Sequence, residues 1–218
     1  MHFETLQCDT PHTFADIGQV LRALDRLCIK DARLGRLRDS LPGGSIELRQ
    51  MPEGFTSLVR IIVYQQISVK AADAIWTRLE AHVRDAETVL QVGVVDLCAY
   101  GLSAPKARYV MKIAERAFAG DFEFGAMVDL TDDAAREHLM ALPGVGPWTA
   151  EIYLLSALQR ADAFPAGDLA LREAAFRALD LPARPTVAQF EILADPWKPW
   201  RAAAARLLWS YYRTRLMR

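Results

Sequence analysis

The sequence has few of the residues on which disulfide frameworks and transition-metal sites depend. Its three cysteines, Cys8, Cys28 and Cys98, are far apart, and its four histidines are scattered with no two standing four positions apart. Disulfide scaffolds need an even set of cysteines, and zinc or iron–sulfur sites need closely spaced ligands. We therefore expect reduced thiols, no metalloenzyme site and no iron–sulfur cluster.

Long apolar runs are also missing. No stretch reaches the roughly 18 apolar residues that span a bilayer. The first ten residues carry Glu4 and Asp9 and have no apolar signal-peptide core. We therefore expect a cytoplasmic protein. The hydrophobic fraction of 52% is ample for a folded core, and 218 residues suffice for one large domain or two small ones.

A strong excess of one charge sign is absent as well. The net charge is −1 and the pI is about 6.4, which argues mildly against a nucleic-acid partner. Locally the picture differs, because Lys198–Arg218 has six basic residues and no acidic ones. A second basic cluster consists of Lys106, Arg108, Lys112 and Arg116. Such asymmetry builds either a basic binding face or an ordinary solvated helix face.

Helical periodicity runs through nearly the whole chain. From Phe14 to Ile29, for example, apolar residues recur at helical spacing, and Ser103 and Thr131 are suitable N-caps for later helices. There is no strand alternation, no repeat and no long linker. The sequence predicts an all-α fold of around ten helices with short connections.

Residues 142–150, with the sequence Leu-Pro-Gly-Val-Gly-Pro-Trp-Thr-Ala, break the chain between two expected helices. Gly144 and Gly146 can adopt positive φ and have no side chain to block a close approach. The helix that follows offers free backbone N–H groups at the positive end of its dipole, which suits a phosphate. Such a hairpin grips a DNA backbone without reading sequence. A plain tight turn is the alternative interpretation.

Asp168 follows Phe164–Gly167 and precedes another expected helix. Its residue type and position suit an N-cap. The helix dipole and N–H groups also hold a carboxylate there in its ionised form. An ionised, oriented carboxylate can stabilise a developing cation or position a water. The capping and catalytic interpretations are compatible.

With Asp168 standing 22 residues after Gly146, the chain resembles the helix-hairpin-helix (HhH-GPD) DNA glycosylases, and within them the bacterial 3-methyladenine DNA glycosylase II type. Matching stretches also lie at residues 55–69, 101–108, 196–201 and 207–209. The resemblance implies the compact form without an N-terminal β-rich domain. It further implies two helical subdomains with a cleft between them, formed by residues 1–54 plus 167–218 and by residues 55–166.

The resemblance implies a monofunctional enzyme that hydrolyses the N-glycosidic bond of alkylated bases, of the 3-methyladenine and 7-methylguanine type, in duplex DNA. The nucleotide is first flipped out of the stack, and the reaction initiates base excision repair. Asp168 matches the family's catalytic aspartate. Trp148 stands where lyase members carry a Schiff-base lysine, so no lyase activity is expected. We expect a monomer that binds damaged double-stranded DNA, at the nucleoid if the source is bacterial.

The base pocket implied by the resemblance attracts a positively charged alkylated base through cation–π contacts. Its expected members are Trp148, Trp209, Tyr64, Tyr153, Ile152 and Leu169. Ile152 and Leu169 stand where aromatic residues are common in the family, which implies a more open pocket. For Trp148 an ordinary core position is the alternative.

The expected DNA contacts have three sources. Gly144, Gly146 and Thr149 match the phosphate-holding positions of the hairpin. Gln65, Gln66 and Ile67 fall in the loop that fills the gap left by the flipped base, although a polar helix cap beside a core isoleucine is the alternative. The remaining contacts are the basic residues Lys106, Arg172 and Arg201.

No cofactor is expected apart from a structural ion that the resemblance implies. In relatives the hairpin carbonyls, here those of Met140, Leu142 and Val145, ligate a monovalent cation, so a structural Na⁺ or K⁺ is expected.

Other functions share part of these features. A non-catalytic helix-hairpin-helix module would need Gly144 and Gly146 but neither Asp168 nor an aromatic pocket. A glycosylase for deaminated, mismatched or oxidised bases would keep Asp168 and line its pocket differently. An all-α small-molecule enzyme is a further class, for which the sequence has no cofactor motif. The hairpin donors outweigh the near-neutral pI, because backbone N–H groups do not enter a charge count.

Overall fold

The computed structural model describes residues 12–42 and 46–216. This part of the chain is helical, and its one β-type pairing is an isolated bridge between Thr13 and Arg160. The α-helices are α1 Ile17–Lys30, α2 Ala32–Asp39, α3 Phe55–Tyr64, α4 Val69–Leu79, α5 Ala86–Ala99, α6 Ala104–Phe118, α7 Asp132–Met140, α8 Pro147–Ser156, α9 Leu169–Ala178, α10 Val187–Ala194 and α11 Arg201–Tyr211. The expected all-α class is confirmed, and no helix in the described ranges is long and apolar enough to cross a membrane.

The described residues form two compact units, and the chain passes between them more than once. Unit 1 comprises the residues up to Leu48, Gln159–Asp162 and those from Leu169 onward, whereas unit 2 comprises Arg49–Leu158 and Ala163–Asp168. The boundaries expected from the sequence lay after residues 54 and 166. The observed boundaries fall after Leu48 and after Asp168, and the short segment Gln159–Asp162 belongs to unit 1.

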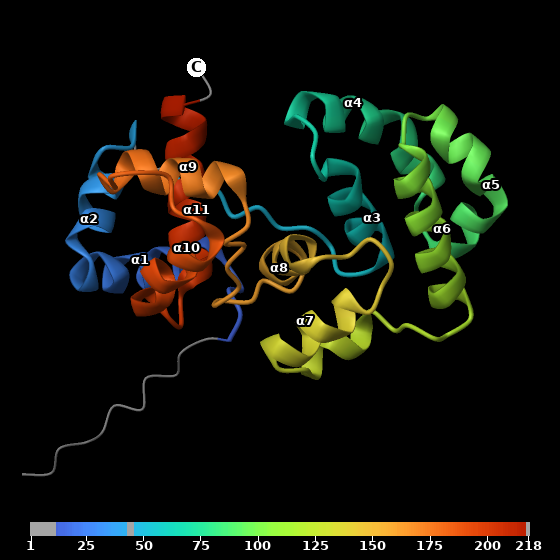
Figure 1. Ribbon diagram of the computed structural model, residues 1–218. Helices are drawn as coiled ribbons and strands as arrows, with labels where there is room; N and C mark the ends of the chain where they lie inside the picture. The colour runs from blue at the N-terminus through green and yellow to red at the C-terminus, as the bar shows by residue number, and fades with distance from the viewer. Residues whose placement is uncertain (1–11, 43–45, 217–218) are drawn as a thin grey trace, which may run out of the picture. The chain divides into compact units, whose positions relative to one another are not determined.

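Unit 1 is built around α11 (Figure 1). The four consecutive alanines Ala202–Ala205 are fully buried, and α11 packs against α9, α1 and α2. Small side chains allow neighbouring helices to approach on several sides of α11. The next residue, Arg206, is also buried, and this burial lowers its pKa to about 10. Its guanidinium donates to the Gln159 side chain and lies over the ring of Phe14.

Asp31 joins three parts of unit 1. It ends α1 and is the N-cap of α2, where its carboxylate accepts a hydrogen bond from the Arg33 backbone. The carboxylate also pairs with the Arg33 guanidinium and accepts the indole N–H of the fully buried Trp197 at 3.0 Å. These hydrogen bonds, that of the Arg33 side chain above all, lower the pKa of Asp31 to about 2.

Unit 2 has α3 at its centre. Its sequence is apolar on most sides, and it packs against α4, α6 and α8. Helices α5 and α6 lie side by side (Figure 1), and α5 is interrupted at Gly93, where φ is +79°.

The Asp31 cluster gives the stability of the protein a defined pH dependence. A carboxyl group whose pKa is lowered on folding stabilises the protein above its unfolded pKa and loses that contribution as the pH falls through the folded pKa. We expect Asp31→Asn to lower the free energy of unfolding by about 1–2 kcal/mol at neutral pH. In denaturant titrations the difference from wild type should shrink between pH 4 and about 2. A difference that does not change with pH would contradict this assignment.

Candidate active site

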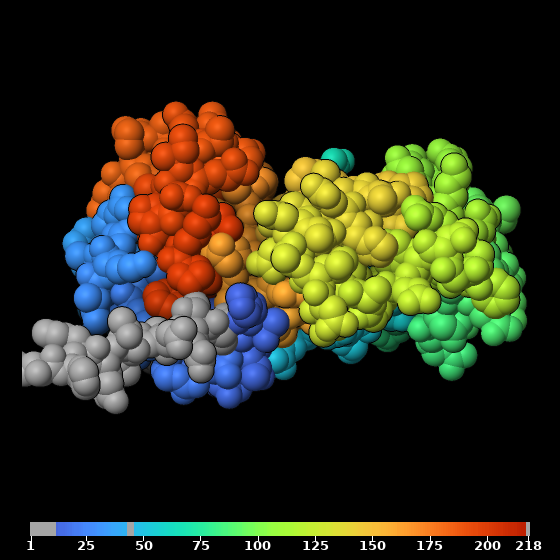
Figure 2. Space-filling model, turned by 90° about the horizontal axis from the view of Figure 1, so that it is seen from below, coloured from blue at the N-terminus to red at the C-terminus, as the bar shows by residue number. Residues whose placement is uncertain are grey.

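The hairpin between α7 and α8 is shaped by two glycines with different roles. Gly144 has φ +77°, and a Cβ atom built there would lie 2.3 Å from the Tyr109 ring. Gly146 is the N-cap of α8 with φ −100°, and a Cβ atom there would have no neighbour within 4 Å. Of the two glycines, Gly144 therefore uses the left-handed backbone and Gly146 does not. At Gly146 the hairpin instead leaves open space in front of the start of α8. Helix α7, which precedes the hairpin, lies at the surface of unit 2 that Figure 2 shows.

Hydrogen bonds brace the hairpin from inside unit 2. The Gln65 amide donates to the Gly144 carbonyl at 3.0 Å and to the Thr149 hydroxyl at 2.8 Å. Thr149 is only 2% exposed. The side chains of Gln65 and Thr149 thus hold the hairpin in place from inside unit 2, and their expected contacts with DNA stay a prediction.

Lys106 supports the same region from α6. Its ammonium donates to the carbonyls of Val63 and Gln65, at 2.9 and 2.6 Å. These carbonyls lie at the end of α3, where intrahelical donors run out. Partial burial lowers the pKa of Lys106. Lys106 was expected to contact DNA, but its ammonium is engaged within unit 2.

The loop between α3 and α4 projects two residues. Gln66 and Ile67 are exposed, Ile67 by 40%, and Gln66 has φ +56°. Left-handed backbone is costly for a residue other than glycine and is often found at functional sites. Ser68, and not a glutamine, caps α4. Gln65 is the C-cap of α3, so the capping part of the alternative holds for that residue, whereas the exposed Ile67 is not a core residue.

Asp168 lies at the end of a tight loop in unit 2. The indole N–H of Trp148 donates to its Oδ2 atom at 2.9 Å. The Asp168 backbone N–H donates to the carbonyl of Pro165 at 2.8 Å, so the end of the loop is folded back on itself. Both side chains are half-buried. The structure thus brings together two of the predicted residues, 20 positions apart in sequence.

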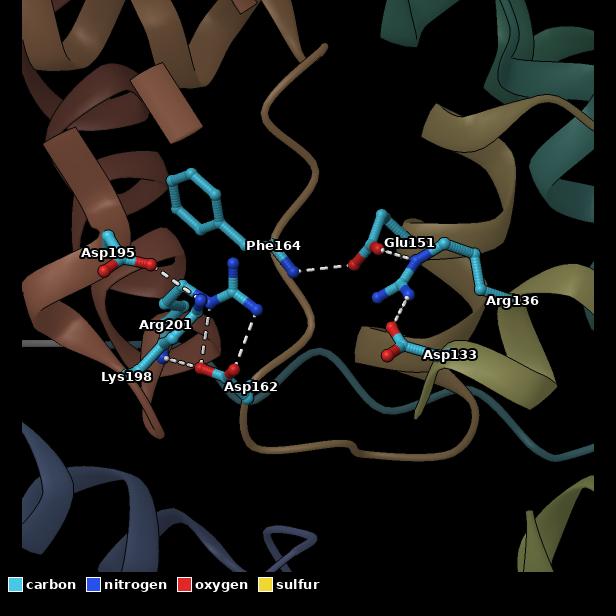
Figure 3. A network of polar contacts seen from close by, with 8 residues as sticks. All are labelled: Asp133, Arg136, Glu151, Asp162, Phe164, Asp195, Lys198 and Arg201. Atoms are coloured by element: carbon cyan, nitrogen blue, oxygen red, sulfur yellow. Dashed lines mark hydrogen bonds and ion pairs between the residues drawn. The ribbon is translucent and has the colours of Figure 1, made fainter. Parts of the chain in front are cut away.

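Glu151 holds the beginning of the same loop, and the sequence analysis did not identify it. Its Oε2 atom accepts the Phe164 backbone N–H at 2.7 Å, and its Oε1 atom accepts from the guanidinium of Arg136, which also pairs with Asp133 (Figure 3). Burial alone would lower the pKa of Arg136, but the two carboxylates raise it above its ordinary value. The only hint in the sequence is an acidic residue one helical turn after Trp148.

The remaining pocket candidates differ in their surroundings. Tyr153 is fully buried, its hydroxyl accepts the Gly54 N–H at 2.8 Å, and burial raises its pKa to about 12. It is therefore a core residue and not an exposed pocket wall.

The Tyr64 hydroxyl donates to Asp73 of α4, and Ile152 is half-buried. The other two candidates belong to unit 1, where Trp209 is half-buried and Leu169 is 57% exposed.

Two arginines expected on DNA are also engaged internally. Arg201 forms a bidentate pair with Asp162 in unit 1, at 2.9 and 2.7 Å (Figure 3). Arg172 donates to the carbonyl of Pro185 at 3.3 Å. Their partners are distant in sequence, so nothing in the local sequence pattern indicated this internal use.

The hairpin carbonyls are the oxygen donors considered for a monovalent cation. The Leu142 carbonyl accepts the Val145 N–H at 3.2 Å within the turn, and Met140 is the last residue of α7. Neutral carbonyl oxygens suit a hard cation. Among the residues described, no group of three or more His, Cys, Asp or Glu side chains is placed to hold a metal ion.

Fold and site together define a helix-hairpin-helix protein with a buttressed Gly/Pro-rich hairpin and an aspartate-bearing loop. The chain belongs to the HhH-GPD superfamily of base excision DNA repair proteins, whose model matches residues 59–199. It is 30% identical over 175 residues to DNA-3-methyladenine glycosylase 1 of Schizosaccharomyces pombe, a match that covers 78% of this chain and 75% of that protein.

Solved structures support the same fold. A 3-methyladenine DNA glycosylase of S. pombe, in complex with abasic DNA, superposes with a TM-score of 0.81 at 28% identity and covers 88% of this chain and 97% of that one. A DNA-3-methyladenine glycosidase of Bacillus halodurans gives a TM-score of 0.73 at 27% identity, covering 91% of each chain. The chain spans about a third (32%) of the length of the "Probable bifunctional transcriptional activator/DNA repair enzyme AlkA" of Mycobacterium tuberculosis, to which it is 37% identical over 164 residues.

The two hairpin glycines should respond differently to substitution. Gly144→Ala places a methyl group against Tyr109 in a left-handed backbone, so we expect a loss of about 2 kcal/mol or more in the free energy of unfolding. Gly146→Ala meets open space and should cost less than about 1 kcal/mol. Thermal or urea unfolding of the two variants measures this difference, and equal losses would contradict it.

Proposed function

We propose that this protein is a monofunctional DNA glycosylase that removes alkylated bases, of the 3-methyladenine and 7-methylguanine type, from duplex DNA. The names of its relatives support the substrate class. The observation that carries the proposal is the hydrogen bond between Trp148 and Asp168, beside a hairpin whose open face marks the start of α8.

In this proposal Asp168 supplies the electrostatic part of the reaction. As the glycosidic bond breaks, the sugar gains oxocarbenium character, and a fixed carboxylate stabilises that charge. Water then adds at C1′ as the carboxylate accepts its proton. The indole N–H of Trp148 orients one carboxylate oxygen, so the group need not reorganise during the reaction. Alkylated purines already carry positive charge and leave readily, which lets a partly open pocket suffice.

The same indole accounts for the proposed absence of lyase activity. Trp148 occupies the hairpin position at which bifunctional members of the superfamily carry a lysine, and an indole nitrogen cannot form a Schiff base. The expected product is an intact strand with an abasic site.

The hairpin is the proposed site of backbone binding. The first turn of a helix has N–H groups without intrahelical acceptors and the positive end of the helix dipole, which attract a phosphate. At Gly146, the N-cap of α8, a side chain would meet open space, so the approach to this end of the helix is clear. Gln66 and Ile67, exposed at the tip between α3 and α4, are the proposed wedge that fills the space left by the flipped nucleotide. The carbonyls of Met140, Leu142 and Val145 are the proposed ligands of a Na⁺ or K⁺ ion.

We further propose that the enzyme acts as a monomer on damaged double-stranded DNA. Its place would be the cytoplasm, or the nucleoid in a bacterium.

Base release from methylated duplex DNA tests the catalytic assignment. Wild type should free 3-methyladenine or 7-methylguanine and leave the strand uncut until alkali is added. Asp168→Asn should lower the single-turnover rate by about 10²-fold or more, since the loss of one electrostatic stabiliser has this size. Its affinity for undamaged duplex should stay close to that of wild type.

Two results would contradict the proposal. Near-wild-type excision by Asp168→Asn would remove that residue from the chemistry. A wild type that binds DNA but frees no base from it would favour a non-catalytic module or another lesion class.

Gly146→Val tests the hairpin. The added side chain stands where a phosphate would approach, so we expect affinity for undamaged duplexes to fall roughly tenfold, the loss of about one charge-assisted hydrogen bond. Duplexes of different sequence should lose affinity alike. Gly125→Val is a matched control, because a side chain at Gly125 also meets open space and lies outside the hairpin. An unchanged affinity of Gly146→Val would argue against the proposed contact.

A further inference from the structure

We propose that Glu151 is a positioning residue that sets the place of Asp168, and this inference rests on the proposed function. Glu151 and Trp148 lie three residues apart on α8 and therefore share one face of the helix. Trp148 reaches the end of the loop, at Asp168, and Glu151 reaches its beginning, at Phe164. One helix face thus holds both ends of the loop.

The loop is short enough to transmit a displacement from one end to the other. Only Pro165, Ala166 and Gly167 separate the two anchored residues. The Ala166 N–H donates to the Phe164 carbonyl at 2.8 Å, and the Asp168 N–H donates to the Pro165 carbonyl at 2.8 Å. Phe164 and Ala166 are buried. Movement of Phe164 relative to α8 therefore shifts the backbone on which the Asp168 carboxylate is mounted.

The chemistry of residue 151 calls for a carboxylate. Each of its oxygens accepts from a different N–H donor, one on the Phe164 backbone and one on Arg136 (Figure 3). A glutamine at this position has one acceptor oxygen, so its amide NH₂ would face one of the two donors. Since Glu151 is only 12% exposed, water cannot easily relieve that conflict. Arg136 in turn fixes which oxygen faces the loop.

This arrangement connects the proposed DNA binding by the hairpin with the proposed catalysis by Asp168 through one helix, α8. The hairpin leads directly into α8, whose second and fifth residues, Trp148 and Glu151, are the two loop anchors. A strand held at the hairpin is therefore placed by the same rigid element that positions Asp168. Reactions that depend on orientation lose on the order of 10²-fold in rate for a displacement of about 1 Å.

Kinetics of Glu151→Gln give the first test. We expect the single-turnover excision rate to fall roughly tenfold to a hundredfold, with affinity for undamaged duplex unchanged. Adding Arg136→Met removes the competing donor and lets the carbonyl of the introduced glutamine accept the Phe164 N–H. The double variant should therefore recover most of the lost rate relative to Glu151→Gln alone. Glu173→Gln, which alters a carboxylate of unit 1 paired with Arg177 and Arg184, is the matched control and should keep the wild-type rate.

A second measurement does not depend on activity. The indole N–H of Trp148, assigned with Trp148→Phe in a ¹⁵N–¹H spectrum, reports the hydrogen bond to Asp168. In Glu151→Gln this resonance should shift or broaden and should return toward its wild-type position in the double variant. The indole N–H of Trp197, bound to Asp31 in unit 1, should not move in either protein.

The outcomes distinguish a failure of the positioning role of Glu151 from a failure of the proposed glycosylase function. If Glu151→Gln lowers the melting temperature but leaves the rate of the folded protein and the Trp148 resonance unchanged, Glu151 is merely structural and the inference fails. The inference also fails if the rate falls without recovery in the double variant. If wild type excises no methylated base, the proposed function fails, and the Trp148 resonance still decides whether Glu151 positions Asp168.

Discussion

The hydrogen bonds that run from Lys106 through Gln65 to the hairpin are the constraint on which the rest of unit 2 depends. Helix α3 ends with carbonyls that need hydrogen-bond donors, and the Lys106 ammonium donates to two of them. The Gln65 side chain in turn donates to the Gly144 carbonyl and the Thr149 hydroxyl of the hairpin. Partly burying an ammonium is costly unless its protons find acceptors. Here they find two carbonyls at the end of α3, one of them that of Gln65, whose side chain in turn holds the hairpin.

Helix α8 extends this constraint toward Asp168. Its start is fixed by the hairpin, and its first turns present Trp148 and Glu151 to the loop that follows. Tyr109 adds a further contact, since its ring occupies the space that a side chain at position 144 would need. Gly144 thus serves close packing inside unit 2, whereas Gly146 leaves space on the outside. The same residue type is therefore required at these two positions of one motif for opposite physical reasons.

Much of the fold and part of the site could be predicted from the sequence. Helical periodicity and cap residues predicted most helices, and the resemblance assigned both Trp148 and Asp168 to the site, although the hydrogen bond between them was not predicted. Helix α2 was not singled out, because it is short, strongly polar and contains Gly35. The supporting contacts were missed for a different reason. Gln65 meets Thr149 across 84 residues and Glu151 meets Phe164 across 13, and such pairings leave no periodic trace in the sequence.

The internal use of basic side chains also has a consequence for how salt affects this protein. Arg201, Arg172 and Lys106 are bound to carboxylates or carbonyls of the protein itself. The salt dependence of DNA binding reflects how many counterions are displaced by cations that neutralise phosphates. A hairpin that binds phosphate through backbone N–H groups displaces few of them. On the proposed function, these three side chains would add little to the salt dependence of DNA binding, because their charges are already engaged by groups of the protein itself.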